Sequence, residues 1–580
     1  EVIFFIEENK IKLGVSYDEL LDILVSNSLE SHEAEHGEGF WTDHWTYNLD
    51  LLENYFSLYP EKRREIIFDK RIFTFFDNAE VIKNRRDKYV LRDKTPKQLH
   101  SVVLDSAKKE MIRKRTAHPH LVRTEYGLGR VYQTTLMNKL LCLLANKLAS
   151  LDPFGTGIEM EADKPNWFDA LNGLPAIFGS SLCETFELKR LTLIIKDLLE
   201  ESGMEVIHIT EEINVFLTGL DKLLQEYLNS SSTERDFQYW DKSYSLKEEY
   251  RAKTRFGFSG KEPETSVAEL IAILKRALAK IDAGIDRAFD KKSNVYTAYF
   301  INEVSQYRLI KEHFIQPLKF TQKKLPAFLE AQMHALRIAP DTKTAKILYG
   351  GIKRSPLYDT GLKMYKCTAS LSQMPEEIGR CRVFTPGWLE HESIWLHMEY
   401  KYLLEVLRSG LYEEFYADFK NALIPFQNAA RYGRNILENS SFLVSSAFPD
   451  KKLHGRGFVA RLSGSTAEFL SIWLAMNLGP NPFFLVNGEL NFKFEPKLAG
   501  WLFRKKEKTY SFNFLGRIDV VYHNALRKDT FGKKGATCKK ILFNDKAGNP
   551  VEITGNTIPA PYALQVRDRK IKRIDIYLED

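Results

Sequence analysis

The chain has 580 residues, 44% of them hydrophobic and 28% charged, which is the balance of a soluble globular protein too long to form a single core. Its 83 Lys and Arg exceed its 77 Asp and Glu by six, and both signs are interspersed along the sequence. The chain therefore has no long basic run of the kind that binds nucleic-acid phosphates. No apolar run approaches the length of a membrane span, and no signal-peptide pattern opens the sequence. These features give little support to a nucleic-acid or membrane partner.

The cysteines are odd in number, scattered, and never spaced as Cys-x-x-Cys. They are Cys142, Cys183, Cys367, Cys381 and Cys538. This pattern argues against a disulfide framework or a zinc site and suits a reducing compartment, so we expect a cytoplasmic protein without a metal. Because the chain opens at Glu1 with an apolar stretch and no initiator Met, we expect it to be part of a longer protein.

Apolar residues at helical spacing predict helices in the first third of the chain, over 15–30, 44–60 and 131–150. Polar and aromatic loops are expected at 31–48 and 152–181. Almost all of 186–345 also has helical spacing. Further helices are predicted over 388–425, 432–438 and 465–478.

From about residue 490 the apolar period changes to two, as in Leu490-Asn491-Phe492-Lys493-Phe494. Turn sequences such as Gly548-Asn549-Pro550 separate these runs. The last ninety or so residues are therefore predicted to form a small antiparallel β-domain.

The first candidate catalytic segment is a glycine-containing loop, His36 to Trp45, in which Trp41 and Trp45 flank Asp43. Burial against aromatic rings disfavours a carboxylate and keeps its proton available, which a general acid for glycoside cleavage needs. Asp is also a favoured N-cap, so Asp43 could equally cap the helix that follows. The local pattern alone does not separate these two interpretations.

The second segment runs from Asp163 to Gly173 and contains Trp167, Asp169 and Asn172. An acid and an amide beside a tryptophan can bind sugar hydroxyls while the ring stacks on a pyranose. Asn-Gly is also a common turn, so this segment is weak evidence by itself.

The third segment, Thr385 to Trp395, places His391 where the predicted helix starts. Backbone N–H groups at a helix start, together with a histidine, can bind an anion, although such a histidine is more often structural. Glu390 and Glu392 flank His391, and helical geometry predicts that both point away from any site that His391 faces.

The fourth segment extends from Glu438 to Thr466 and gathers glycines, arginines and small hydroxylic residues, among them Ser463 and Gly464. This composition suits an oxyanion such as phosphate. The structural alternative is a tightly packed loop that enters the helix at Thr466.

The four segments resemble, in order and spacing, the catalytic domain of glycoside hydrolase family 94, the cellobiose and related β-glucan phosphorylases. Asp43 follows Trp41 as the general acid of that family follows a Trp, and His391 precedes Trp395 by four positions as the phosphate-binding His does. The gap from Glu438 to Leu462-Ser463-Gly464-Ser465-Thr466-Ala467 is similar too. The resemblance covers roughly residues 35–190 and 355–580. The longer helical stretch between them is more typical of families 149 and 161 of the same clan, which act on β-1,3-linked oligoglucans.

This resemblance implies a mainly α fold, with an (α/α)6-barrel-type catalytic domain, incomplete at its N-terminus, and a C-terminal antiparallel β-domain. The expected division is 1–190 for the first part of the barrel with the acid loop and 191–345 for a helical segment that is partly an insertion. The second part of the barrel, with the phosphate loops, occupies 346–489, and the β-domain occupies 490–580.

The activity that the resemblance implies is inverting phosphorolysis of β-linked gluco-oligosaccharides to α-glucose 1-phosphate, without a cofactor and with inorganic phosphate as co-substrate. Asp43 would be the acid. Phosphate would bind at His391, Ser463 and Gly464. Sugar would bind at Trp41, Trp167, Asp169, Asn172 and Glu438.

Two departures from the family pattern bear on these roles. Ser463 stands for a Thr, and the second Asp of the acid loop is replaced, which leaves Thr42-Asp43-His44. The family's phosphate-binding Arg lies upstream, so an N-terminal region or a second chain would supply it, and a homodimer is a further candidate assembly. The alternatives are an inverting hydrolase with Glu438 as its base and a non-catalytic glycan-binding subunit.

Overall fold

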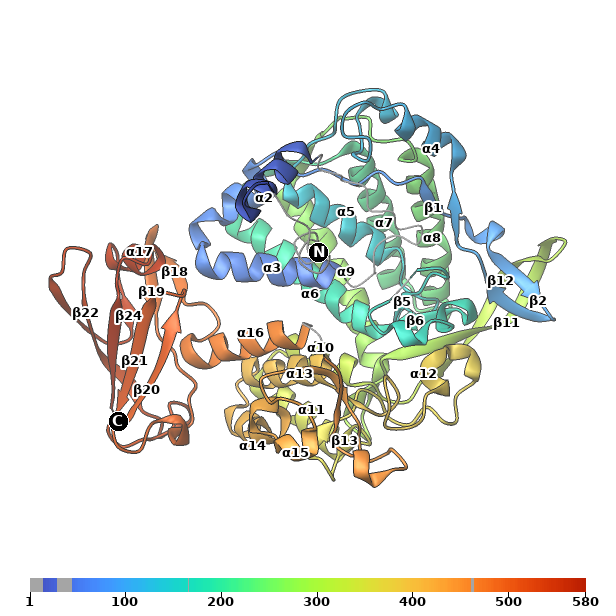
Figure 1. The fold of residues 1–580 in the computed structure, drawn as a ribbon. Helices are drawn as coiled ribbons and strands as arrows, with labels where there is room; N and C mark the ends of the chain where they lie inside the picture. The colour runs from blue at the N-terminus through green and yellow to red at the C-terminus, as the bar shows by residue number, and fades with distance from the viewer. Residues whose placement is uncertain (1–13, 29–43, 165, 461–463, 580) are drawn as a thin grey trace.

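The computed structural model describes residues 14–28, 44–164, 166–460 and 464–579 and shows a helical body beside a β-domain (Figure 1). Helices dominate as far as Leu478, and the strands from Phe483 onward build the β-domain. Helix α16 (Gly464–Leu478) is the last helix of the body and leads directly into that domain. Within the described ranges, none of the helices has the length and apolar character that crossing a bilayer requires.

The helical body is built from helices of which most bury one face. They are α3 (His44–Leu58), α5 (Leu136–Leu148), α6 (Leu182–Ser202), α7 (Glu211–Asn229), α8 (Arg235–Lys253), α9 (Val267–Ala288), α10 (Leu329–Arg337), α11 (Thr342–Arg354), α13 (Leu396–Arg408), α14 (Tyr412–Ala422) and α16. Helices α10 and α13, at the centre of the body, are buried almost all round. In α9, Leu270, Leu274, Ala277 and Ile281 form one buried stripe at helical spacing. The helix starts where Ser266 accepts a hydrogen bond from the Glu269 N–H, a side-chain cap that Thr135 and Asp341 repeat at α5 and α11.

Helix packing follows one main row, in which α5, α6, α10, α13 and α16 each contact the next. Helices α7, α8 and α9 pack together beside α5 and α6, since α7 contacts α5 and α9 contacts α6. Helix α11 contacts α10, and α14 contacts α13. The contacts among the described helices therefore establish paired helices within one helical body. They do not confirm an (α/α)6 barrel.

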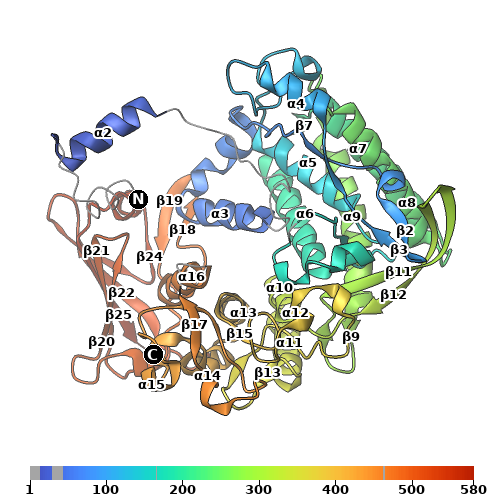
Figure 2. The ribbon, with the colours of Figure 1, turned by 45° about the vertical axis from the view of Figure 1, so that its right-hand side comes forward.

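The helices predicted over 44–60, 131–150 and 465–478 are confirmed as α3, α5 and α16. The helix predicted over 15–30 is α2 (Tyr17–Asn27), which buries none of its residues and stands apart from the other helices (Figure 2). Shorter helices are α4 (Ser106–Arg113), α12 (Arg380–Val383), α15 (Ala429–Tyr432) and α17 (Tyr562–Arg567).

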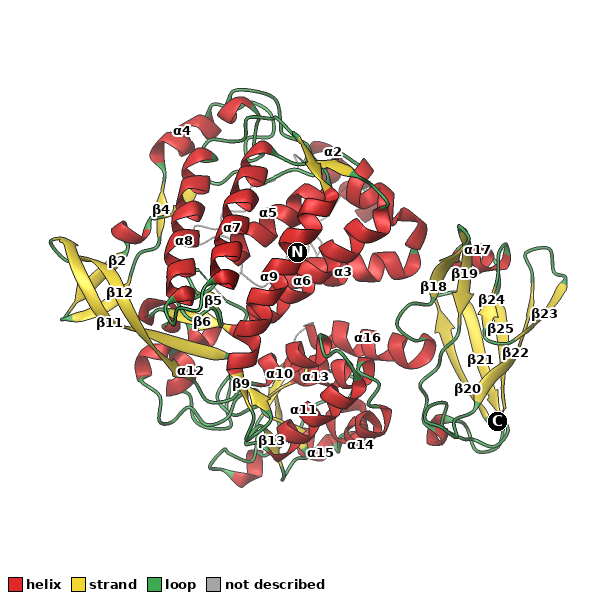
Figure 3. Cartoon of the chain, turned by 180° about the vertical axis from the view of Figure 1, so that it is seen from behind, coloured by secondary structure: helices red, strands yellow, loops and turns green. Residues whose placement is uncertain are grey.

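The prediction of helix over nearly all of 186–345 is wrong at a long hairpin, β11 (Tyr299–Lys311) with β12 (Phe314–Lys324). This stretch is rich in aromatic and β-branched residues, which favour a pleated surface. The hairpin projects from the body as part of a six-stranded sheet (Figure 3). The order of that sheet is β3 (Thr95–Gln98), β2 (Tyr89–Arg92), β12, β11, β6 (Gly179–Ser181) and β5 (Ile158–Glu159).

Other strands form short antiparallel pairs on the body. They are β1 (Glu80–Ile82) with β4 (Val102–Leu104), β7 (Val206–His208) with β8 (Glu264–Ser266), β9 (Phe289–Asp290) with β10 (Val295–Tyr296), and β13 (Tyr358–Asp359) with β14 (Met364–Tyr365).

Two further helix predictions are wrong at their boundaries. Residues 388–395 form a turn and the short strand β15 (Ile394–Trp395), so the helix there starts only at Leu396. The helix predicted over 432–438 has already ended, because Gly433 takes a left-handed conformation with φ 71° after α15. Strand β15 pairs with β16 (Ser440–Leu443), and β16 pairs with β17 (Gly457–Ala460).

The C-terminal β-domain is confirmed, but it is not wholly antiparallel. One sheet has the order β18 (Phe483–Val486), β19 (Glu489–Lys493), β24 (Thr557–Ile558), and the other has the order β20 (Thr509–Phe514), β21 (Ile518–Asn524), β25 (Arg573–Glu579), β22 (Thr537–Asn544), β23 (Pro550–Thr554). Strands β21 and β25 run parallel. Alternate residues of both strands, such as Val520 and Ile576, are buried in the core of the domain.

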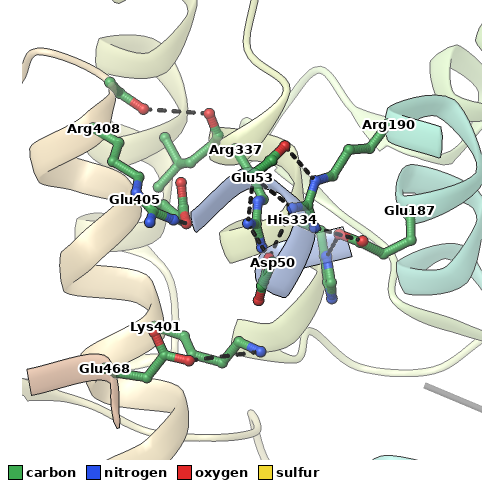
Figure 4. Close-up of polar contacts among 12 residues, drawn as sticks. Asp50, Glu53, Glu187, Arg190, His334, Arg337, Lys401, Glu405, Arg408 and Glu468 are labelled. Carbon is green, nitrogen blue, oxygen red and sulfur yellow. Dashed lines mark hydrogen bonds and ion pairs between the residues drawn. The ribbon is translucent and has the colours of Figure 1, made fainter. Parts of the chain in front are cut away.

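A buried group of ion pairs fixes α3 to the body (Figure 4). Arg190 of α6 donates to Asp50 and to Glu53 of α3, both at 2.7 Å, and Arg337 of α10 also binds Asp50. Glu187 pairs with Arg190 at 3.0 Å. Burial by itself would raise the pKa of Asp50, but the two guanidinium groups hold it below its usual value. The cluster therefore joins α3, α6 and α10.

We expect Arg190→Met to lower the free energy of unfolding by about 3 kcal/mol, because Asp50, Glu53 and Glu187 lose the cation they share, and their remaining partners, Arg337 and His334, replace it only in part. Arg63→Met is the matched control, since Arg63 pairs with Glu201 where both side chains are about half exposed. Its cost should stay within about 1 kcal/mol. Urea unfolding followed by circular dichroism measures both. Equal costs for the two variants would show that the cluster does not hold α3.

Candidate functional site

A cavity of about 580 Å³ opens where the loop before α6, the turn before β15 and the start of α13 meet. It is lined by Trp167, Phe168, Asp169, Cys367, Arg380, Phe384, Leu389, Glu390, Trp395, His397, Ser441, Phe442 and Val459. Aromatic rings and a few polar groups thus share one concave surface, as is typical of small-molecule and glycan sites.

The rings of the cavity are held in fixed orientations. Trp395 lies parallel to Phe442, with centroids 5.9 Å apart and an interplanar angle of 6°. The Trp167 indole N–H donates a hydrogen bond of 3.0 Å to the Tyr47 hydroxyl of α3. Flat rings of this kind can stack on the apolar faces of sugars.

Two carboxyl groups face the cavity from different surroundings. Asp169 forms an ion pair with Arg380, with 2.8 Å between Oδ2 and Nη2. Burial, and next the charge of Asp169, raise the pKa of Glu390 above its usual value. Asp169 thus has a salt-bridge partner, while Glu390 holds its proton more strongly than a free carboxyl group does.

The third polar group is His397, near the start of α13. Its Nε2 lies 3.5 Å from Oε1 of Glu468 in α16, and Glu468 lies 3.9 Å from the Lys401 ammonium. Lys401 lies over the Tyr47 ring at 4.6 Å, and Trp167 meets His397 edge-on at 5.7 Å. With the hydrogen bond from Trp167 to Tyr47, these contacts form a closed circuit of five side chains. The circuit fixes the orientations of Trp167 and His397.

The backbone of Gly464, the first residue of α16, packs against the His397 imidazole so closely that a Cβ at this position would overlap the ring. Burial lowers the pKa of His397, and Glu468 partly opposes that shift. The neutral imidazole is therefore favoured, with its ring at the N-terminal end of a fifteen-residue helix. Such a helix end attracts anions.

Of the residues predicted for the site, Trp167 and Asp169 line the cavity and Gly464 borders it through His397. Asn172 is exposed, and its side-chain oxygen accepts the Arg380 N–H at 3.1 Å. Glu438 does not line the cavity, because both contacts of its Oε1 go to the Arg434 guanidinium, at 2.9 and 2.7 Å. Predictions for Trp41, Asp43 and Ser463 lie outside the described residues.

The structure places His391 differently from its prediction as a phosphate ligand. Its side chain is 1% exposed, Nδ1 donates to the Phe384 carbonyl at 2.7 Å, and Nε2 accepts the Leu371 N–H at 3.1 Å. Both ring nitrogens are thus used by backbone groups, and His391 does not line the cavity. Leu389 and Glu392, both with positive φ, keep this segment in a tight turn instead of a helix.

The expectation that Glu390 and Glu392 both point away from the site holds for Glu392, which pairs with Lys366 at 2.7 Å. It is wrong for Glu390, which lines the cavity. Glu390 and His391 do point apart, but the turn that replaces the predicted helix directs Glu390, and not His391, to the cavity lining. The same error hid His397, since the helix start that carries a histidine lies eight residues further on, at Leu396.

Comparison with protein-family models and with curated proteins finds no match for the chain. Among solved structures, an uncharacterized conserved protein from Thermus thermophilus has 10% identity over 58% of this chain and 92% of its own, with a TM-score of 0.22. The GH63 mannosylglycerate hydrolase of the same organism, in complex with glucose, has 11% identity over 58% of this chain and 87% of its own, with a TM-score of 0.23. At such TM-scores neither similarity supports a conclusion on fold or function.

The contact between Gly464 and His397 predicts a non-additive pair of substitutions. Gly464→Ala should lower the free energy of unfolding by about 1–3 kcal/mol, because the added methyl group has no room beside the imidazole. In a His397→Ala background the same change should cost close to nothing, since the ring is gone. Urea unfolding of the four proteins in this cycle tests the contact. Equal costs in both backgrounds would contradict it.

The burial of His391 predicts a pH-dependent effect on stability. Burial lowers the pKa of His391 in the folded protein below the value of about 6.5 that it has in the unfolded chain. Its contribution to the free energy of unfolding is therefore complete above about pH 6.5 and is lost as the pH falls toward the pKa of the folded state. We expect His391→Ala to cost about 1–3 kcal/mol at pH 7.5, because the buried Leu371 N–H and the partly buried Phe384 carbonyl lose their partner. The cost should shrink toward pH 5. A variant of unchanged stability that binds phosphate poorly would restore His391 as a ligand.

Proposed function

We propose that the chain is a carbohydrate-active enzyme whose cavity holds a β-linked gluco-oligosaccharide against Trp167 and Trp395. The observation that carries this proposal is the cavity itself, in which two indole rings share one surface with Asp169, Glu390 and His397. Carboxylates can accept hydrogen bonds from sugar hydroxyls while the rings cover apolar faces of the pyranose. Resemblance of the sequence segments around these residues to β-glucan phosphorylases supports the same substrate class.

We further propose that phosphate is the nucleophile and that the reaction is an inverting phosphorolysis. The support is the junction of His397 with the start of α16, where an imidazole and helix N–H groups can bind a dianion. Arg380, although paired with Asp169, adds positive charge to the same cavity. In this proposal His397 takes the phosphate-binding role predicted for His391, and Gly464 keeps its own.

The proposed reaction is a single displacement. Asp43 donates its proton to the glycosidic oxygen while a phosphate oxygen attacks the anomeric carbon from the opposite face. The bond to the leaving sugar breaks as the bond to phosphate forms, which yields α-glucose 1-phosphate. Asp43 lies outside the described residues. Its assignment is supported by the resemblance and by its place in the chain, directly before α3, whose Tyr47 binds Trp167 of the cavity.

One observation favours a second candidate, an inverting hydrolase. Glu390 has a raised pKa beside the ionised pair of Asp169 and Arg380, which suits an acid and a base that activates water. Glu438, the base predicted for this alternative, is held by Arg434 away from the cavity lining. The hydrolase would therefore use Asp169 and Glu390.

The two candidates differ in their need for phosphate. We expect the protein, incubated with a panel of β-gluco-oligosaccharides, to release α-glucose 1-phosphate only when phosphate is present. His397→Gln should raise the KM for phosphate about tenfold or more while changing the KM for the glucan little, because only the anion loses a contact. His208→Gln, in strand β7 outside the cavity lining, is the matched control and should change neither value.

Release of free glucose at the full rate without phosphate would reject the phosphorylase and favour the hydrolase. In that case Glu390→Gln should lower turnover by about 10²–10⁴-fold, the usual effect of losing a general acid. Binding of the oligosaccharide without turnover under any condition would leave only a glycan-binding protein.

A further inference from the structure

A second cavity, of about 260 Å³, lies on the six-stranded sheet and shares no lining residue with the first. It is lined by Lys83, Asp87, Val90, Leu91, Arg92, Leu99, His100, His313 and Phe314. These residues come from the segment before β2, from β2, from the residues that follow β3, and from the turn that leads into β12 and the start of that strand. Figure 3 shows these strands on the side of the body away from the β-domain.

Main-chain hydrogen bonds fix the walls of this cavity to one another. The Leu91 N–H donates to the His313 carbonyl at 2.7 Å, the Leu99 N–H to the Lys88 carbonyl at 3.0 Å, and the Lys83 N–H to the Ser101 carbonyl at 2.8 Å. Beneath the sheet lies a buried cluster of Tyr89, Phe178, Trp240, Ile315 and Phe320, against which Leu91 packs. The cavity is therefore preformed, which reduces the entropy lost when a ligand binds.

Basic side chains outnumber acidic ones around the opening. In the part of the chain that the structure describes, Lys83, Arg92 and His100 make no side-chain hydrogen bond or ion pair. The one carboxylate of the lining, Asp87, lies 3.6 Å from the Arg86 guanidinium, which offsets its charge. Two cations, Lys83 and Arg92, on one small concave surface attract an anion.

The histidines add directional donors. His313 is stacked on Phe314 with centroids 4.5 Å apart, and its Nδ1 lies 4.0 Å from the Glu312 carboxylate. His100 follows β3 with an exposed side chain, which leaves its ring nitrogens accessible at the opening.

We propose that this cavity binds a small phosphomonoester. Lys83 and Arg92 hold the phosphate group, His100 and His313 donate to its oxygens, and the carbon body rests on Val90, Leu99 and Phe314. Two cations without an ion-pair partner in the described part of the chain suit a dianion better than a carboxylate, and a guanidinium matches phosphate geometry. The cavity is smaller than the roughly 300–1,000 Å³ of sites for drug-sized ligands, which limits the carbon body to about the size of one sugar. This site is separate from the first cavity and does not depend on the function proposed for it.

Equilibrium dialysis with labelled ligands tests the proposal on the whole chain, using inorganic phosphate, α-glucose 1-phosphate and glycerol 3-phosphate as separate probes. The same measurements are repeated on His397→Gln without any glucan, so that binding at the first cavity is recognised as the part that weakens in this variant. We expect both phosphomonoesters to bind more tightly than inorganic phosphate. Comparing the two esters shows whether the carbon body is a sugar or a shorter chain.

The double variant Lys83→Ala/Arg92→Ala should weaken phosphomonoester binding by about tenfold or more, because two charge-assisted contacts are lost. Neither side chain has a partner among the described residues, so we expect the variant to fold, and its thermal unfolding checks this. Lys94→Ala, an exposed cation between β2 and β3 that does not line the cavity, is the matched control and should bind as the wild type does.

Unchanged binding in the double variant would overturn the proposal. Equal weakening by Lys94→Ala, or displacement by chloride at the same ionic strength as effectively as by phosphate, would reduce the cavity to a nonspecific basic surface and also overturn it. Loss of α-glucose 1-phosphate formation in the activity assay would not bear on this site, because the two cavities share no residue.

Discussion

The shared ion pairs of Asp50 and Glu53 with Arg190 and Arg337 are the contact on which the placement of α3 depends. Ions removed from water lose solvation, and the cost is offset only when every charge has well-placed partners. Glu187 supplies one more partner and itself binds His334 at 2.8 Å. Because the cluster joins helices that are far apart in sequence, it can form only when α3, α6 and α10 have packed together.

Two other parts of the molecule depend on the position of α3. At one end, Tyr47 accepts the hydrogen bond that orients Trp167 in the larger cavity. At the other end, Arg567 of the β-domain donates to the Leu58 carbonyl at 3.0 Å and pairs with Glu61 at 2.8 Å. A helix held by buried charges thus connects the wall of the candidate site with the C-terminal domain.

Sequence periodicity predicted the elements whose pattern is local. The buried stripe of α5 and the alternation in β20 and β25 are properties of single segments, so both could be recognised from the sequence. The hairpin at 299–324 was missed although its aromatic and β-branched residues favour strands, and its pairing with β6 and β2 is a contact between distant segments that no local pattern shows. The parallel pairing of β21 with β25 is likewise a contact between segments distant in sequence.

The residues of the candidate site likewise divide into those with a local sequence pattern and those placed by contacts between distant segments. Trp167 and Asp169 were predicted because rings and acids stand together in one short segment. His397 and Glu390 were missed because their roles depend on where the turn before β15 ends, which Leu389 and Glu392 set through their positive φ. Glu468 carries no signal at all in the sequence, since it acts only through its position 3.5 Å from His397 across two helices.

Three titratable groups of the site have different surroundings, and its chemistry depends on these differences. Asp169 is paired, Glu390 retains its proton more strongly, and His397 is kept largely neutral between Glu468 and the end of α16. A dianion that enters beside His397 would favour the protonated imidazole, with Glu468 as the second partner for its positive charge. Binding of phosphate and uptake of a proton should therefore be linked at this residue.

A crystal structure of the protein soaked with a β-gluco-oligosaccharide and phosphate tests the central claim most directly. It should show sugar rings against Trp167 and Trp395 and phosphate in contact with His397 and the Gly464 N–H. Sugar bound away from these rings, or phosphate held by His391 in place of His397, would contradict the assignment of the site.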